Sequence, residues 1–138
     1  RTVNFEPFLD RDINAGFSGG EIKRSELLQL MAQEPSLVLF DEPESGVDLE
    51  NMVLIGKTVR GLLDGDLTPK PHKSMLEQKV GRNTSGLIIT HTGYILEYVN
   101  ADRGQVLYNG FLCCEANPRD ILDHISKYGY KECVRCLQ

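Results

Sequence analysis

The chain has 138 residues, of which 41% are hydrophobic and 25% charged, with a formal net charge of −5 at pH 7. These values are typical of one globular domain with a real core, and they exclude a disordered or collagen-like chain. The negative balance argues against broad affinity for nucleic acid, and apolar runs such as Leu37–Phe40 are too short to cross a membrane. We therefore expect a cytoplasmic protein with no nucleic-acid partner and no membrane-inserted segment.

The first part of the chain is predicted to be helical. Residues 1–16 carry scattered apolar side chains among charges, which is typical of short helical pieces that pack on other structure. Apolar residues then recur at helical spacing over 20–34, and a proline ends that pattern. Ser18, Gly19 and Gly20 lie at the start of this helix, an arrangement suited to holding an anion against backbone N–H groups.

Two apolar runs predict strands, the first of them parallel and buried on both faces. Residues 36–42 lack the alternation of a half-exposed strand and end in Asp41 and Glu42. Residues 86–92 form a second buried run, near whose end His91 lies. Because ligands in open α/β sheets bind beyond the carboxyl ends of the strands, polar side chains at these ends are candidates for chemistry.

The remaining segments alternate helices with a loop and a hairpin. In chain order we expect a helix over 49–63, a long surface loop or insertion over 64–85, a short helix over 93–99, a hairpin over 105–114 and a helix over 117–128. The dipeptide Asn109-Gly110 is the strongest local hairpin signal in the chain.

Four short motifs, FSGGE, LVLFDE, SGVD and ITH, follow one another in this order. A strand that ends in two adjacent carboxylates has the form of a Walker B element: the first carboxylate holds Mg²⁺, and the second orients and deprotonates an attacking water. Alone, Asp41 and Glu42 would be read as an acidic pair that faces solvent. The combination of four motifs favours the catalytic interpretation.

This order of motifs resembles the C-terminal half of ABC-type ATPases. Within that superfamily, the stretches FLDRDINAGFSGGEIKRSELLQL and THTGYILEYVNADRGQVLYNG are similar to the ATPases of the Suf iron–sulfur cluster assembly system. The resemblance implies an α/β fold, the C-terminal part of an ABC-type P-loop NTPase domain with a mostly parallel sheet flanked by helices and closed by a hairpin. It assigns 1–34 to the helical subdomain and 35–138 to the core, with 64–85 as a probable insertion.

The resemblance also implies a role for the glycine-rich turn. Ser18, Gly19 and Gly20 match the signature motif, which contacts the γ-phosphate of an ATP molecule bound to the opposite protomer. Taken alone, the two glycines would be interpreted as a loose turn.

Further roles are implied at the strand ends. Asp41 matches the Mg²⁺-side carboxylate, Glu42 the general base, and His91 the switch histidine that touches the γ-phosphate. Asp48 matches the D-loop residue that crosses the dimer interface; a helix N-cap with Asn51 near its third position is the structural alternative for it. No metal is expected in this chain alone, since Mg²⁺ would arrive at Asp41 with ATP.

The sequence contains no convincing P-loop, the glycine-rich turn that cradles the phosphates of ATP. Gly56-Lys57-Thr58 copies its last three residues, but Asn51 stands where the first glycine belongs, and the apolar stripe of a helix runs through the segment. We interpret it as a decoy. We expect an N-terminal part with the P-loop to precede Arg1 in the natural protein, and this chain alone to bind ATP very weakly.

Four cysteines, Cys113, Cys114, Cys133 and Cys136, lie in the last quarter of the chain. In a chain of this size without a secretion signal, reduced thiols are favoured over a disulfide framework. Adjacent residues on a strand point to opposite faces, so Cys113 and Cys114 cannot share a metal without a bulge. We expect one core cysteine, one surface cysteine and a reduced or flexible pair in the tail.

The resemblance as a whole implies a function. The intact protein is expected to hydrolyse ATP, with Mg²⁺, at the interface with a second ATPase protomer and so to drive iron–sulfur cluster assembly on scaffold proteins of the SufB and SufD type. Because Pro43 after Asp41 and Glu42 agrees with transporter ATPases, the ATP-binding subunit of an ABC transporter is one alternative. A docking module that binds a complete partner without hydrolysis is the other.

Overall fold

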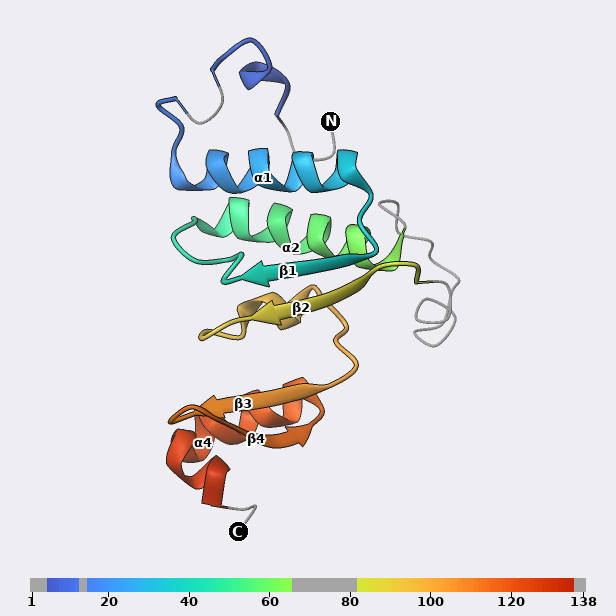
Figure 1. The fold of residues 1–138 in the computed structure, drawn as a ribbon. Helices are drawn as coiled ribbons and strands as arrows, with labels where there is room; N and C mark the ends of the chain where they lie inside the picture. The colour runs from blue at the N-terminus through green and yellow to red at the C-terminus, as the bar shows by residue number, and fades with distance from the viewer. Residues whose placement is uncertain (1–4, 13–14, 66–81, 136–138) are drawn as a thin grey trace. The chain divides into compact units, whose positions relative to one another are not determined.

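The computed structural model describes residues 5–12, 15–65 and 82–135, which fall into two compact units divided between Val99 and Asn100. The elements of the first unit are η1 (Glu6–Phe8), α1 (Gly19–Gln33), β1 (Leu37–Asp41), α2 (Leu49–Asp64), β2 (Ser85–Ile89) and η2 (Tyr94–Glu97) (Figure 1). Those of the second are β3 (Gly104–Tyr108), β4 (Phe111–Ala116) and α4 (Pro118–Arg135). Most of the predicted loop over 64–85 lies outside the described residues.

Helix α1 begins with a capping box. The Ser18 hydroxyl accepts a hydrogen bond from the Glu21 N–H at 3.4 Å, and the Glu21 carboxylate accepts one from the Ser18 N–H at 2.7 Å. The helix packs against α2, which spans the predicted apolar stripe. Both predicted helices are therefore confirmed, with boundaries within a residue of those expected.

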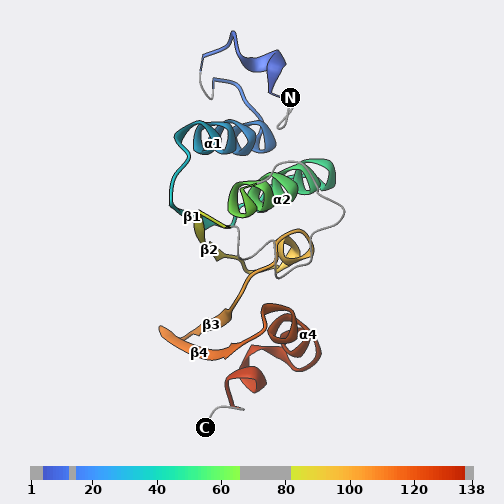
Figure 2. The ribbon, with the colours of Figure 1, turned by 90° about the vertical axis from the view of Figure 1, so that its right-hand side faces the viewer.

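The sheet of the first unit consists of β1 and β2, which pair in parallel from Leu37 with Ser85 to Asp41 with Ile89. Alternate residues of β1, Val38 and Phe40, are buried against the helices. Figure 2 shows α2 and η2 on one side of the two strands. The apolar side chains that point away from them are exposed, namely Leu37, Leu39, Leu87 and Ile89. The prediction of burial on both faces is wrong for this chain, because the described elements cover only one face.

The core of the first unit lies between α2, the inner face of the sheet and η2. Ile55 and Val59 of α2 and Ile95 of η2 are fully buried. Gly56 lets the Tyr98 ring approach the helix, since a Cβ at this position would lie 2.4 Å from a ring carbon. This core fixes the ends of β1 and β2, where the candidate residues lie.

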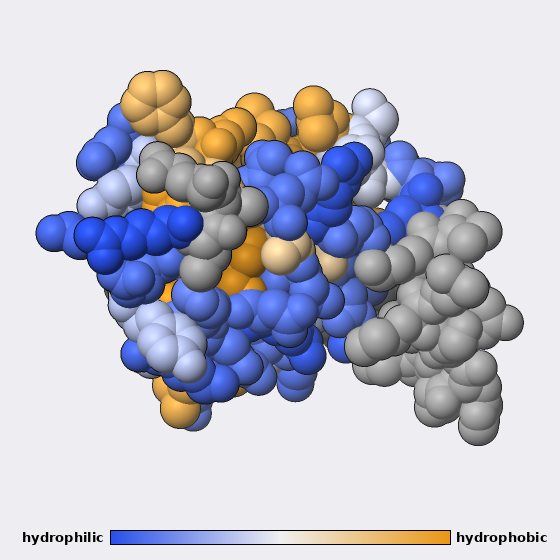
Figure 3. Space-filling view, turned by 90° about the horizontal axis from the view of Figure 1, so that it is seen from below, coloured by the Kyte–Doolittle hydropathy of each residue, from blue (hydrophilic) through white to orange (hydrophobic). Residues whose placement is uncertain are grey.

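The second unit is a hairpin covered on one face by a helix. Asn109 and Gly110 both have positive φ, 49° and 81°, as a type I′ turn requires, so the predicted hairpin is confirmed. Val106 and Ile121 are buried between the hairpin and α4. Figure 3 shows hydrophobic residues gathered along one edge of a mostly hydrophilic face. The exposed apolar side chains of this hairpin are Leu107, Phe111 and Leu112.

Helix α4 bends where the sequence predicts a helix end. Gly129 has φ 79° and ψ 166°, which are not helical angles, so the first helical segment stops at Tyr128 as predicted. A second segment continues to Arg135 and contains Cys133, which is only 5% exposed. The tail pair was predicted to be reduced or flexible: Cys133 is a free thiol, but it is packed in the core of the second unit rather than flexible, and Cys136 lies outside the described residues.

Candidate functional site

The two strand ends bring Glu42 and His91 into contact. Pairing of β1 with β2 continues beyond the strands, since the Glu42 N–H donates to the Ile89 carbonyl at 2.9 Å. His91 Nδ1 then lies 2.8 Å from Glu42 Oε1, with the two side chains 61% and 39% exposed. Two residues 49 positions apart, both singled out by the sequence, thus lie in close contact at a position that a ligand can reach. Asp41, at the end of β1, is exposed beside them.

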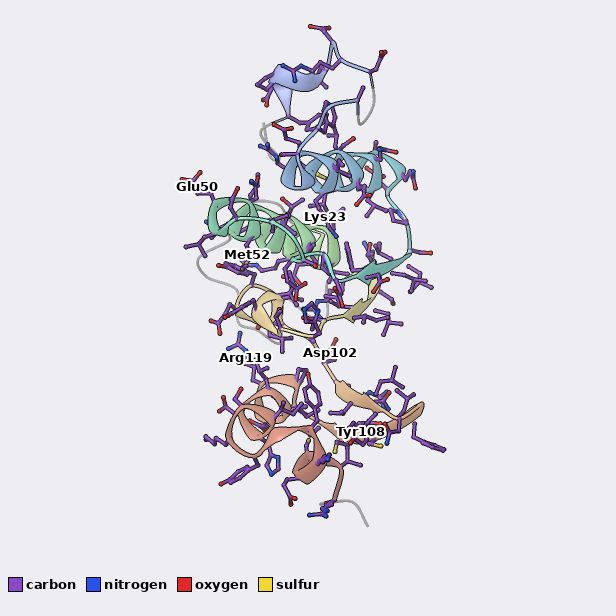
Figure 4. The ribbon with its side chains drawn as sticks, turned by 90° about the vertical axis from the view of Figure 1, so that its left-hand side faces the viewer. Lys23, Glu50, Met52, Asp102, Tyr108 and Arg119 are labelled. Carbon is purple, nitrogen blue, oxygen red and sulfur yellow. The ribbon has the colours of Figure 1, made fainter. Side chains whose placement is uncertain are left out.

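The backbone of Glu42 is held in an unusual conformation. Its φ is +45°, in the left-handed region that non-glycine residues rarely adopt and that is often found at functional sites. The Glu42 carbonyl accepts hydrogen bonds from the Ser45 N–H and from Lys23 Nζ, both at 3.0 Å. Lys23 reaches this carbonyl from α1 (Figure 4). Lys23 was not predictable from the sequence, because only the fold brings α1 to this turn.

Glu44 connects the turn after β1 to the segment around His91 through hydrogen bonds. Its Oε1 atom accepts hydrogen bonds from the hydroxyls of Thr90 and Thr92, the latter at 3.0 Å. The Thr90 hydroxyl in turn accepts a hydrogen bond from the Gly93 N–H at 2.9 Å. Glu44 is only 5% exposed. Because Thr90 and Thr92 flank His91, Glu44 fixes the loop that carries the histidine.

Glu44 was not among the residues predicted from the sequence, although the sequence carries a signal for its contact. A third carboxylate follows the Asp41-Glu42-Pro43 run, and hydroxyl residues flank His91 on both sides. Carboxylates accept hydrogen bonds from hydroxyls, so this complementarity could have suggested the contact.

The predicted signature turn packs closely on the segment around Asp48. A Cβ at Gly19 would lie 3.1 Å from the Gly46 carbonyl oxygen, and one at Gly20 would lie 2.7 Å from the Asn51 side-chain nitrogen. A larger residue at Gly20 would displace the Asn51 side chain, which hydrogen-bonds to Asp48. Close packing therefore explains why glycine occupies both positions in this chain. Ser18 and Gly19 are exposed at the N-terminus of the helix.

Asp48 is the N-cap of α2, the structural alternative considered for it. Its Oδ1 accepts from the Asn51 N–H and its Oδ2 from the Asn51 side-chain amide, both at 2.8 Å. The Asn51 backbone hydrogen bond, reinforced by the side-chain one, lowers the pKa of the Asp48 carboxyl below its usual range. Capping does not compete with the predicted D-loop role, because Asp48 is also exposed.

The segment Gly56-Lys57-Thr58 lies inside α2, as predicted for a decoy. Gly56 is packed under Tyr98, and the buried Thr58 hydroxyl donates to the Leu54 carbonyl at 2.8 Å. The helix runs through the segment, so its backbone N–H groups are engaged within the helix rather than turned toward a phosphate.

Asp41 and Glu42 suit a hard cation only as part of a larger site. Mg²⁺ is commonly held by one or two carboxylates together with substrate phosphates and water. Among residues 5–12, 15–65 and 82–135, no group of three or more His, Cys, Asp and Glu side chains could hold a metal ion. The Asp41 carboxylate is exposed at the end of β1. In the described part of the chain, no helix is both long and apolar enough to cross a membrane.

Comparisons with known proteins agree on one type of relative. No protein-family model matches the chain. It is 36% identical over 105 residues to "Probable ATP-dependent transporter SufC" of Escherichia coli, an alignment that covers 76% of this chain and 36% of that protein. It is 35% identical over 124 residues to "ABC transporter I family member 6, chloroplastic" of Arabidopsis thaliana, covering 90% of this chain and 31% of that protein.

A further relative carries a functional name. The chain is 29% identical over 128 residues to "Iron-sulfur cluster assembly protein SufC" of Plasmodium falciparum, covering 93% of this chain and 32% of that protein. The chain thus spans about a third of the length of the curated relatives that it matches.

Proposed function

Because this chain belongs to the SufC-like ABC-type ATPases, we propose that the intact protein hydrolyses ATP at an interface between two protomers. The observation that carries the proposal is the contact of Glu42 with His91 at the paired ends of β1 and β2. The names of two relatives, which call them ATP-dependent or ABC transporters, support the use of ATP.

In this proposal Glu42 is the general base and His91 a catalytic partner. Glu42 orients the attacking water and accepts its proton, while His91 contacts the γ-phosphate and is oriented by its close contact with Glu42. Glu44 and Lys23 are positioning residues, because they hold the loop of His91 and the carbonyl of Glu42. Phosphoryl transfer needs little covalent chemistry from the protein, so such positioning is the main contribution expected of these side chains.

Asp41 is proposed to hold Mg²⁺ together with the phosphates of the bound nucleotide. When bound, the ion neutralises charge on the phosphate oxygens. The exposed position of Asp41 next to Glu42 supports this assignment.

Ser18, Gly19 and Gly20 are proposed to complete the site of a second protomer. Backbone N–H groups at a helix N-terminus favour an anion, and Ser18 and Gly19 are exposed there. Asp48, at the start of the neighbouring helix, is proposed as an interface residue. We also propose that residues 1–34 belong to the helical subdomain and residues 35–138 to the core. For the cellular compartment, our prediction is the cytoplasm.

The biological task that we propose is iron–sulfur cluster assembly on scaffold proteins of the SufB and SufD type. The name of the Plasmodium relative supports this task. The names of the Escherichia and Arabidopsis relatives favour a second candidate, the ATP-binding subunit of a transporter. Co-purification of the intact protein with soluble scaffold proteins would support assembly, whereas co-purification with membrane-embedded subunits would support transport.

The test is Glu42→Gln in the intact protein, assayed for ATP hydrolysis. Removal of the base should lower the rate by about 10²- to 10³-fold and leave ATP binding in place, so that an ATP-bound dimer accumulates. Glu50→Gln is the matched control, because Glu50 is an exposed glutamate on α2 whose replacement should leave the rate unchanged. A normal rate in Glu42→Gln would remove Glu42 as the base. ATP binding without hydrolysis in the unmodified protein would favour a docking module.

A further inference from the structure

A bulge in β4 turns Cys114 toward the core of the second unit. Gln105 pairs with Glu115 and Val106 with Cys113, so Cys114 is the extra residue between two paired ones. Its φ is +49°, a left-handed conformation that interrupts the alternation of the strand. Cys114 consequently packs with Val106 and the other core residues of this unit, while the Cys113 thiol contacts the carbonyl of Phe111 in its own strand at 3.6 Å.

The bend in α4 places a second cysteine against the first. After Gly129, the second helical segment runs past β4 with Cys133 buried on its inner side. The two sulfur atoms lie 3.5 Å apart, and the Cys114 thiol donates to the Cys133 carbonyl at 2.8 Å. A bulge and a helix bend thus bring together two thiols that are 19 residues apart in the sequence.

We propose that Cys114 and Cys133 form a reversible disulfide, a redox modification site that joins β4 to the second segment of α4. The two sulfurs already lie within van der Waals contact, and a disulfide needs a sulfur–sulfur distance of about 2.05 Å, so bond formation requires an approach of about 1.5 Å. Cys114 is half-exposed and accessible to a small oxidant, whereas Cys133 is buried and accessible mainly to Cys114. This difference assigns Cys114 as the thiol that attacks the oxidant first and Cys133 as the resolving residue.

The oxidant in this proposal is a low-molecular-weight disulfide such as glutathione disulfide. The Cys114 thiolate attacks one sulfur of the oxidant, whose S–S bond breaks and releases one glutathione thiolate. The Cys133 thiolate then attacks the Cys114 sulfur of the mixed disulfide and expels the second glutathione. Two protein thiols are oxidised, one glutathione disulfide is reduced to two thiols, and the two thiol protons of the protein end on the released glutathiones.

The surroundings of the pair affect the rate and the stability of the bond. Burial, followed by the hydrogen bond to Cys133, raises the pKa of the Cys114 thiol. A raised thiol pKa lowers the thiolate fraction near neutral pH, so oxidation should be slow. A thiol of high pKa is also a poor leaving group, so the disulfide should resist reduction once it has formed.

Tryptic mapping of the intact protein tests the proposal. The protein is equilibrated with mixtures of reduced and oxidised glutathione, quenched with acid, alkylated and digested. Cleavage after Arg135 separates Cys133 from Cys136, so a Cys133 disulfide and a Cys136 disulfide give different linked peptides. We expect the peptide Gly104–Arg119 to be linked to Glu132–Arg135, with fragmentation that places the bond at Cys114 and not at Cys113.

The adjacent cysteine supplies the matched control. Cys113→Ser should keep the linked peptide, whereas Cys114→Ser and Cys133→Ser should lose it. Dominant linkage through Cys113 or Cys136 would overturn the proposal, and so would two free thiols at Cys114 and Cys133 in the most oxidising mixture. If a serine variant fails to fold, the mapping of the unmodified protein still decides, because it requires no substitution.

Discussion

The two units differ in the range of the contacts that build them. In the first unit, the hydrogen bonds that shape the candidate site join residues far apart in the sequence, such as Thr90 with Glu44, 46 positions away. In the second unit, neighbouring segments make the fold, since β4 follows β3 after two turn residues and α4 follows directly. The candidate site therefore depends on strand pairing between distant segments, whereas the cysteine pair depends on contacts between neighbouring segments.

The units share one property, a sheet covered on one face only. The outward side chains of β1 and β2 are exposed, and so are those of the hairpin at Leu107 and Leu112. The difference is that the first unit brings Glu42 and His91 together at its strand ends, whereas the second carries the ion pair of Arg103 with Glu115 there. Stability and chemistry should consequently respond separately to substitutions in the two units.

The largest effect is expected from Ile55→Ala, which removes a buried side chain from the core of the first unit. Ile55 is fully buried, so the substitution should lower the free energy of unfolding by about 2–5 kcal/mol. Hydrogen exchange should accelerate in α2 and leave α4 nearly unchanged. Ile121→Ala, in the core of the second unit, is the reciprocal control and should accelerate exchange in α4 instead. Equal acceleration in both helices in either variant would show that the units do not unfold separately.

A smaller effect is expected at Glu44, which joins the two halves of the candidate site. Glu44→Ala removes the acceptor of the Thr90 and Thr92 hydroxyls and should destabilise the first unit by about 1–3 kcal/mol. Glu44→Gln retains a carbonyl acceptor and should recover part of the loss. Urea unfolding measures both, with Glu50→Ala as the exposed control, expected within about 0.5 kcal/mol. A loss at Glu44 no larger than at Glu50 would mean that the buried carboxylate does not fix the loop.

Local signals in the sequence predicted the local features. The apolar spacing before a proline predicted α1, and Asn109-Gly110 predicted the hairpin, because each signal acts over a few residues. The motif order also directed attention to Glu42 and His91, which the structure brings into contact.

Features that depend on distant residues were not predictable in the same way. The apolar sequence of β1 does not determine whether other elements cover both faces of the strand. Leu39, which was expected to be buried, is exposed. The inward turn of Cys114 depends on a bulge, and its contact with Cys133 depends on the bend at Gly129. Glu44 was missed because its partners lie more than 40 residues away, at the end of another strand.

The smallest effect is a pH dependence that arises at Asp48. Hydrogen bonds from Asn51 lower the pKa of the Asp48 carboxyl in the folded chain. The stabilisation that Asp48 contributes is therefore fully present above the unfolded-state pKa of about 4. It is lost as the pH falls through the pKa of the folded state. Asp48→Asn keeps a good N-cap but cannot titrate. Unfolding measured between pH 6 and pH 2 (about the range over which carboxyls titrate) should lose stability less steeply in the variant. Identical slopes would exclude Asp48 as a source of the acid sensitivity.

The most direct test of the central claim is a double-mutant cycle on the ATP hydrolysis rate of the intact protein, built from Glu42→Gln and His91→Ala. Residues that act as one catalytic unit are strongly non-additive. If Glu42 and His91 act through their mutual contact as one catalytic unit, the double variant should be no slower than Glu42→Gln alone. Rate losses that multiply in the double variant would show that the two residues act independently, and they would contradict the account.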